Sequence, residues 1–90
     1  MIKHYNIQVT GKVQGVGFRY HTMKKASELN VKGFVKNKHD HSVYIEAEGE
    51  EASLNDFLHW CKKGPQHAYV ETFNFSESNI EGFLKFEIKH

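Results

Sequence analysis

Apolar and polar side chains alternate in several parts of the chain, and this pattern predicts strands. Tyr5, Ile7 and Val9 alternate with polar neighbours, as in a strand with one buried face, so we expect a strand over residues 4–10. The same pattern predicts strands from residue 33 to about 39 and from 43 to 48, joined by a hairpin at 39–42. Aromatic-rich residues 69–75 predict a fourth strand, and Leu84, Phe86 and Ile88 predict a fifth.

Helical spacing appears in two places. Met23, Ala26 and Leu29 predict a helix from about residue 19 to residue 30. The second helix is predicted to begin at a capping box of Ser53 and Asp56 and to end at Gly64 and Pro65. Its apolar stripe consists of Leu54, Phe57, Leu58 and Cys61.

The order of these elements is β-α-β-β-α-β with one more short strand. This order predicts an α+β fold of the ferredoxin-like type, a two-layer sandwich with two helices on one face of a mainly antiparallel sheet. Ninety residues fit one hydrophobic core, so we expect a single domain over residues 1–90. Many unrelated activities share this scaffold, so function has to be inferred from particular residues.

The composition of the chain limits the kinds of binding partner that we expect. The formal net charge is only +1, which gives no large field to attract nucleic acid or anionic lipid, so we expect neither nucleic acid nor membrane as a partner. Cys61 is the one cysteine and has no partner for an intramolecular disulfide, which favours a reducing cytoplasm. The first ten residues lack the apolar stretch of a signal peptide or membrane span. We expect a cytoplasmic monomer.

A glycine-containing loop between the first strand and the first helix is the main candidate site. Residues 11–19 read Gly-Lys-Val-Gln-Gly-Val-Gly-Phe-Arg, and loop amides at a helix N-terminus can bind an anion. Gly15 and Gly17 can adopt positive φ, and Arg19 supplies a planar fork of donors that suits phosphate. The alternative is a surface turn with a solvated Arg19. Tyr20 at the third position after Gly17 argues against a dinucleotide fingerprint, and no Gly-Lys-Ser/Thr sequence indicates a P-loop.

Two segments resemble the signatures of the acylphosphatase family: residues 11–19, and Gly33-Phe34-Val35-Lys36-Asn37. The resemblance continues through Val43, Gly49, the Phe57 region and residues 82–88. It implies hydrolysis of an acyl phosphate without a metal or other cofactor, with Arg19 as the phosphate-binding catalytic residue and Asn37 as the residue that orients the attacking water. The phosphate would also be bound by loop amides, supplied by Gln14, Gly15, Val16, Gly17 and Phe18.

The expected chemistry needs few groups. The leaving group is a carboxylate, which is stable as an anion near neutral pH, so no general acid has to protonate it. An asparagine amide holds a water by hydrogen bonds but has no useful basicity. We hypothesise that a phosphate oxygen of the substrate accepts the proton of the water, while Arg19 and the loop amides stabilise an in-line transfer.

Two positions depart from the family pattern. His41 stands where a glycine usually follows Asp40, which puts the geometry of that turn in question because histidine tolerates positive φ less well than glycine. His90 stands where an aromatic residue is common, and no role is assigned to it.

Several alternatives remain open at this point. His39 and His41 could begin a metal site, although two histidines in a turn are weak support. His21 is close in sequence to the loop, without an assigned role. Lys32-Gly33-Phe34 matches the start of an RNA-binding motif, and a non-catalytic regulatory module of the same fold is a further alternative. Cys61, Met23, Phe57, Phe73 and Phe86 are expected to pack in the core rather than to bind ligands.

Overall fold

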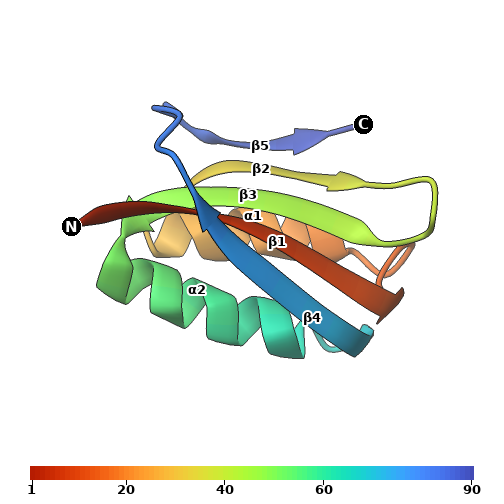
Figure 1. The fold of residues 1–90 in the computed structure, drawn as a ribbon. Helices are drawn as coiled ribbons and strands as arrows, with labels where there is room; N and C mark the ends of the chain where they lie inside the picture. Colours follow the sequence, from red (N-terminus) through yellow and green to blue (C-terminus); the bar gives the residue numbers. More distant parts are fainter.

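Two helices pack side by side against one face of a five-stranded sheet in the computed structural model, which describes residues 1–90 (Figure 1). The elements are β1 (Ile2–Lys12), α1 (Phe18–Glu28), β2 (Lys32–Asn37), β3 (Val43–Glu50), α2 (Glu51–Lys63), β4 (Tyr69–Ser78) and β5 (Phe86–Lys89). The ferredoxin-like arrangement with an added strand is therefore confirmed.

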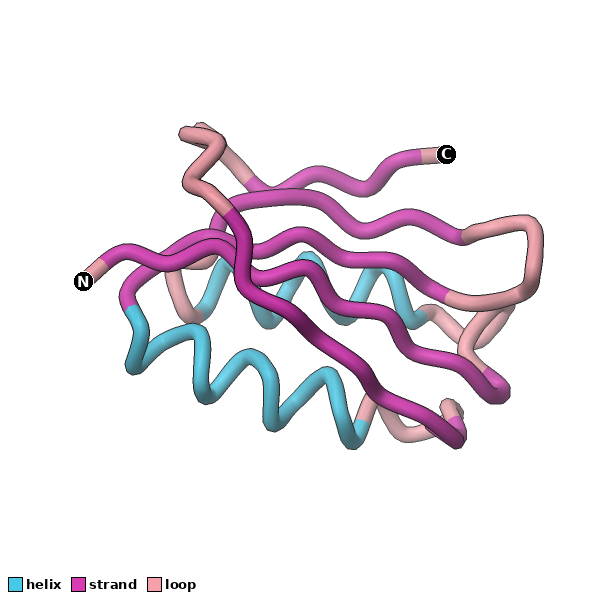
Figure 2. Tube along the Cα trace, viewed as in Figure 1, coloured by secondary structure: helices cyan, strands magenta, loops and turns pink.

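The strand order in the sheet is β4-β1-β3-β2-β5. Each of the first three neighbouring pairs is antiparallel, and β5 runs parallel to β2. Because β4 and β5 lie at opposite edges, the chain between them crosses the face of the sheet that the helices leave open (Figure 2). The same topology brings the end of β1, the start of α1, and the ends of β2 and β5 to one end of the sheet.

The core lies between the helices and the sheet. Alternate residues of the two central strands point into it, as the sequence pattern predicted, including Ile7, Val9 and Ile45. Leu54, Phe57 and Cys61 of α2 complete it from the helix side. Phe73 and Phe86 pack against this cluster at its margin.

The predicted start of the second helix is wrong. The helix begins at Glu51, directly after β3, and Ser53 lies inside its first turn, with no side-chain cap. The backbone N–H of Glu51 instead donates to the carbonyl of Met1, 3.1 Å away on the neighbouring strand. The backbone carbonyl of Met1, next to β1, thus pairs with an N–H group at the start of the helix, where the sequence pattern predicted a capping side chain.

Three other details differ from the predicted pattern. The first helix ends at Glu28, and its buried positions are Phe18, Thr22 and Ala26 rather than Met23. Thr22 is accommodated there because its hydroxyl donates to the Phe18 carbonyl at 2.7 Å. Leu84 is 91% exposed and precedes β5, so it does not belong to that strand.

A buried polar cluster fastens the β4–β5 crossing to the open face of the sheet. We call it the Glu48 cluster: the side chains of His4, Glu46 and Glu48 with the backbone of residues 81–83. The Glu48 carboxylate accepts hydrogen bonds from the backbone N–H groups of Glu81, Gly82 and Phe83. His4 lies between the two carboxylates, 2.8 Å from Glu48 and 2.9 Å from Glu46.

The Glu48 carboxyl is ionised in this cluster. Burial by itself would raise its pKa, but the N–H of Glu81, His4 and the N–H groups of the next two residues together lower the pKa below its ordinary value. Each ring nitrogen of His4 faces a carboxylate oxygen, which can only accept hydrogen bonds. Within the cluster, the Glu48 carboxylate and both ring nitrogens of His4 thus all have hydrogen-bond partners.

Candidate active site

A hollow of about 270 Å³ lies at the end of the sheet where the loop after β1 meets the ends of β2 and β5. It is lined by residues from these three segments and from the start of α1, among them Gly15, Gly17, Arg19, Asn37, Ile88 and His90. Arg19 and Asn37 are 18 residues apart in sequence and are brought together here by the pairing of β2 beside β3 and β5. No aspartate or glutamate side chain lines the hollow.

The loop holds its backbone in a form that exposes N–H groups. Gly15 has φ 73° and Gly17 has φ 77°, left-handed values that favour glycine. Gly17 is the N-cap of α1, no side chain caps the helix, and its first turn has no acidic residue. The first N–H groups of α1 therefore have no partner within the helix, and the positive end of the helix dipole lies at the same place.

The side chain of Gln14 ties this loop to the neighbouring hairpin. Its amide nitrogen donates to the backbone carbonyls of Lys38 and Ser42, each at 2.9 Å. The side chain is therefore occupied by structural hydrogen bonds, and it does not line the hollow. This tie was not foreseen, since nothing in the local sequence indicates which carbonyls will lie opposite Gln14.

The side chains of Phe18 and Val16 are directed away from the hollow. Phe18 is buried, and its ring packs against Trp60 with centroids 5.8 Å apart, which anchors the start of α1 in the core. Val16 lines a different groove, between the helices. Of the six residues expected to bind phosphate, Gly15, Gly17, Phe18 and Arg19 line the hollow, while Gln14 and Val16 do not.

Arg19 is fixed at one corner of its guanidinium. Its Nη1 atom donates to the carbonyl of Lys89 at 3.1 Å and lies 3.1 Å from Nδ1 of His90. No protein group accepts from Nε or Nη2. The contacts with the end of β5 were missed from sequence, because they depend on the parallel pairing of β5 with β2.

Asn37 is the last residue of β2 and is half-buried. Its side-chain Oδ1 has almost no contact with solvent, and no group of the protein donates a hydrogen bond to it. No other buried side-chain nitrogen or oxygen lacks a partner. A buried acceptor without a partner costs about 1–3 kcal/mol, and this one belongs to a residue that lines the hollow.

The hairpin after Asn37 keeps a left-handed residue despite the missing glycine. His41 has φ 71° and is exposed, so it adopts a conformation that histidine populates at a cost. The Asp40 carboxylate accepts from both the hydroxyl and the backbone N–H of Ser42, which closes the turn and lowers the pKa of Asp40. The departure from the family pattern is thus accommodated within the turn.

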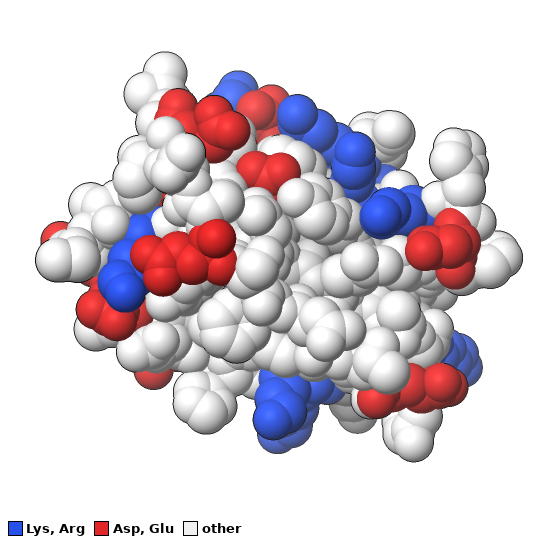
Figure 3. Space-filling view, in the orientation of Figure 1, with Lys and Arg blue, Asp and Glu red and all other residues white.

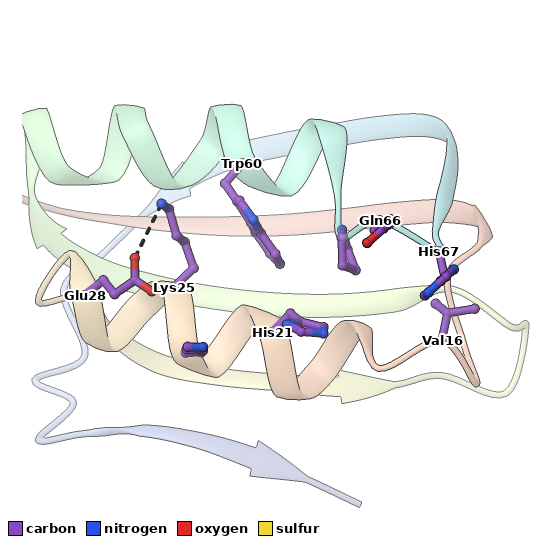
Figure 4. Close-up of a pocket in the computed structure, with 9 residues that line it drawn as sticks. Val16, His21, Lys25, Glu28, Trp60, Gln66 and His67 are labelled. Carbon is purple, nitrogen blue, oxygen red and sulfur yellow. Dashed lines mark ion pairs between the residues drawn. The ribbon is translucent and has the colours of Figure 1, made fainter.

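A second and larger groove, of about 420 Å³, runs between the two helices (Figure 4). Trp60 from α2 and His21 and Lys25 from α1 point into it, and Val16 and His67 lie at one end. Lys25 is paired with Glu28 at 3.6 Å. The groove contains neither Arg19 nor Asn37, so we assign the candidate site to the smaller hollow.

The remaining candidate groups from the sequence lie apart from the hollow. His39 and His41 are both exposed in the hairpin, and no group of three or more histidine, cysteine, aspartate or glutamate side chains is placed to hold a metal ion. Cys61 is fully buried in the core, and burial raises the pKa of its thiol. No helix is long and apolar enough to cross a membrane.

Comparison with known proteins is consistent across sequence and structure. The family model for acylphosphatase matches residues 5–88. The acylphosphatase of Thermotoga maritima is 47% identical over 89 residues, covering 99% of each chain, and that of Archaeoglobus fulgidus is 48% identical over 84 residues, covering 93% of this chain and 94% of the relative. The crystal structure of acylphosphatase from Bacillus subtilis superimposes with a TM-score of 0.95 at 40% identity, covering 100% of both chains. The chain therefore belongs to the acylphosphatase family.

Proposed function

We propose that this chain hydrolyses the carboxyl–phosphate bond of acyl phosphates, giving a carboxylate and inorganic phosphate. The observation that carries the proposal is the meeting, in one hollow, of an anion-binding loop, the unused donors of Arg19 and the unpaired Oδ1 of Asn37. Family membership supports the same reaction class.

The phosphoryl group would bind to the loop and Arg19. The free amides at the start of α1 suit the phosphate oxygens, and Nε and Nη2 of Arg19 form a fork that matches two of them. The hollow has no aspartate or glutamate side chain to repel the substrate. These donors are already oriented by the loop geometry, the Phe18 ring and the anchored Nη1, so little reorganisation is needed as charge develops during transfer.

Asn37 would hold the attacking water in line with the bond that breaks. Its Oδ1 accepts a hydrogen from the water, whose oxygen attacks phosphorus while the bond from phosphorus to the carboxylate oxygen breaks. The bond electrons leave with the carboxylate, and a phosphate oxygen takes the proton. An acyl phosphate dianion and water thus give a carboxylate and a dihydrogen phosphate monoanion, with no general acid required.

The RNA-binding alternative is disfavoured by the environment of Phe34. This aromatic residue of the motif-like segment is only 9% exposed, because Phe83 of the β4–β5 crossing packs edge-on against it and Lys89 lies over its ring at 4.3 Å. A base-stacking platform needs an exposed ring face. Acidic and basic side chains are also mixed over this side of the molecule, with neither sign dominant (Figure 3).

We also propose that the protein acts as a metal-independent monomer in the cytoplasm. A carboxylate leaving group reduces the need for a Lewis acid, and the anchored Arg19 supplies positive charge at the phosphate. The single, buried Cys61 fits a reducing compartment.

The purified protein should hydrolyse a synthetic acyl phosphate in the presence of a chelator. Release of carboxylate and inorganic phosphate in equal amounts, unaffected by the chelator, would support both the reaction and its independence of metal. Thiol-blocking reagents should leave the rate unchanged, because the thiol of Cys61 is buried. Failure to hydrolyse acyl phosphates with several different acyl groups would favour a regulatory module.

A further inference from the structure

The hollow continues into a third depression, which we call the α1–β5 groove. The groove has a volume of about 550 Å³, compared with about 270 Å³ for the hollow. Tyr20, in the first turn of α1, lines both spaces. On the side of the sheet, Ile88 lines the hollow and Phe86 lines the groove, and residues two apart on a strand point to the same face. The groove therefore extends the hollow along α1 and β5.

The walls of the α1–β5 groove are mainly apolar. On α1, Tyr20, Met23 and Ser27 are spaced by three and four residues, so they lie on one face of the helix over roughly 10 Å. The sequence pattern placed Met23 in the core, but this residue is half-buried and lines the groove. Phe86 and Val31 line the groove from the side of the sheet. The groove is thus a mainly apolar track about two helical turns long.

Three lysines border the groove without an acidic partner. Lys24, Lys32 and Lys85 belong to the lining, and none of them forms an ion pair within the protein. Lys32 begins β2 and Lys85 directly precedes β5, so these two lie at the end of the groove away from the hollow. Glu28 is the one acidic residue of the lining, and its carboxylate is 3.6 Å from the ammonium of Lys25. The far end of the groove therefore carries unmatched positive charge.

We propose that the α1–β5 groove binds the acyl group of the substrate, and that the preferred acyl phosphates carry an extended apolar chain with a second anionic group at its end. This assignment rests on the proposed function and adds a substrate class to it. With the phosphate in the hollow, the acyl group begins beside Tyr20, its chain lies against Met23 and Phe86, and the distal anion reaches Lys32 and Lys85.

The dimensions of the groove set the length of the chain. An extended chain advances about 1.2 Å per bond, so a track of roughly 10 Å accommodates about eight carbons. Full burial of one methylene corresponds to about a fourfold gain in affinity, and a groove that is open on one side covers only part of each methylene. We therefore expect about a twofold gain for each added methylene until the chain reaches the far end.

The first test measures kcat and KM for acetyl phosphate and for straight-chain acyl phosphates of four, six and eight carbons. KM should fall about twofold for each methylene, while kcat stays within a few-fold, because the groove does not contact the bond that breaks. A terminal carboxylate on the eight-carbon chain should lower KM by a further two- to fivefold, the approximate range for exposed ion pairs, and high salt should reduce this gain. A KM that does not depend on chain length would overturn the assignment of the groove.

Two sets of variants locate the effect in the groove. Met23→Glu places a charge midway along the apolar track, so it should reduce the ratio of kcat/KM for the eight-carbon substrate to that for acetyl phosphate by roughly five- to tenfold. Met23→Leu keeps the apolar wall and should retain the ratio. Replacing both Lys32 and Lys85 by glutamine should remove the preference for a terminal carboxylate, whereas Lys63→Gln, an exposed site at the end of α2, should not. An unchanged ratio in Met23→Glu would contradict the proposal.

A binding measurement separates the groove from catalysis. The eight-carbon dicarboxylate, which is the carboxylate product of that substrate, should shift the methyl resonance of Met23 in an NMR titration, and acetate should not. The methyl group of the exposed Met1 is the internal control and should stay in place. An unmoved Met23 methyl would overturn the groove assignment even if acyl phosphates are hydrolysed. A shifted Met23 methyl in a protein that hydrolyses no acyl phosphate would reject the proposed function and retain the groove as a site for apolar anions.

Discussion

The Glu48 cluster and the hollow beside Arg19 are both polar sites on the same sheet, but they differ in how many of their hydrogen bonds are already made. Both Glu48 oxygens accept from the crossing, and both nitrogens of His4 face carboxylates. In the hollow, by contrast, Oδ1 of Asn37 has no partner and most of the Arg19 fork is free.

The difference separates structural from functional use of buried polar groups. A buried charge that is matched on every side has no capacity left for a ligand, and removing one member leaves its partners uncompensated. A site that must bind an anion and a water has to keep donors and acceptors unpaired, at some cost in stability. Four predictions test this contrast.

The largest expected effect is on activity at the hollow. Arg19→Ala and Asn37→Ala should each reduce kcat/KM for an acyl phosphate by roughly 10²–10³-fold, the range for removal of one preorganised group in an active site. Arg19→Ala should also weaken phosphate inhibition, whereas Asn37→Ala should lower kcat with little change in phosphate affinity.

Urea unfolding of the same two variants tests whether Arg19 and Asn37 contribute to the stability of the fold. Their free energies of unfolding should fall by no more than about 1 kcal/mol below that of the wild type, and loss of the unpaired Oδ1 in Asn37→Ala can raise it. Lys63→Ala and Asn55→Ala, at exposed positions of α2, are the matched controls and should leave kinetics and stability unchanged. Substantial activity in either site variant would overturn the assigned roles.

Glu48→Gln should show the opposite profile. Losing the charge removes one carboxylate partner of His4 and weakens the hydrogen bonds to the crossing, so we expect a loss of about 2–4 kcal/mol in the free energy of unfolding. Under conditions where the variant is folded, kcat/KM should remain within a few-fold of the wild type. Glu87→Gln on exposed β5 is the control for removal of a glutamate charge. A variant that is stable but inactive would place Glu48 in the site instead.

The contribution of Glu48 should also depend on pH in a defined direction. Its folded-state pKa is lowered, so the folded protein binds fewer protons at this group, and the stabilisation is present above the unfolded value of about 4.3. This stabilisation is lost as the pH falls through the lower pKa that Glu48 has in the folded protein. The difference in unfolding free energy between wild type and Glu48→Gln should therefore be constant from about pH 7 to pH 5 and shrink at more acidic pH. If the difference in unfolding free energy grows as the pH falls, the pKa of Glu48 is not lowered in the folded protein.

The smallest effect concerns the hairpin beside the hollow. His41→Gly should raise the free energy of unfolding by up to about 1 kcal/mol, because glycine adopts φ 71° without the strain that histidine bears there. His39→Gly in the same turn, where φ is not positive, should not stabilise the protein. If His41→Gly is destabilising, the histidine makes a contribution beyond occupying the turn.

Local patterns were sufficient for most of the fold. Alternation at Tyr5, Ile7 and Val9 and the stripe on the second helix predicted which faces are buried, because period follows directly from strand and helix geometry. The start of that helix was wrong, since the partner of the Glu51 N–H is the carbonyl of Met1, 50 residues away along the chain. Contacts between distant segments leave little trace in the local sequence.

At the candidate site, too, local motifs predicted some features, and others depend on contacts between distant segments. The loop and the positions of Arg19 and Asn37 followed from two motifs, and their meeting in one hollow agrees with the expectation. The tie from Gln14 to the hairpin, and the contact of Arg19 with His90, could not be predicted because each depends on strand pairing and register. The Glu48 cluster was likewise invisible, since Glu46 and Glu48 alternate with apolar residues as solvent-facing side chains do.

A phosphate titration followed by amide NMR tests the central claim most directly. The account predicts that the largest shifts occur at the backbone amides of residues 15–19, with a smaller change at the side-chain amide of Asn37, and that Arg19→Ala abolishes them. Shifts concentrated instead at Trp60 and His67, around the groove between the helices, would place the anion site elsewhere and contradict the account.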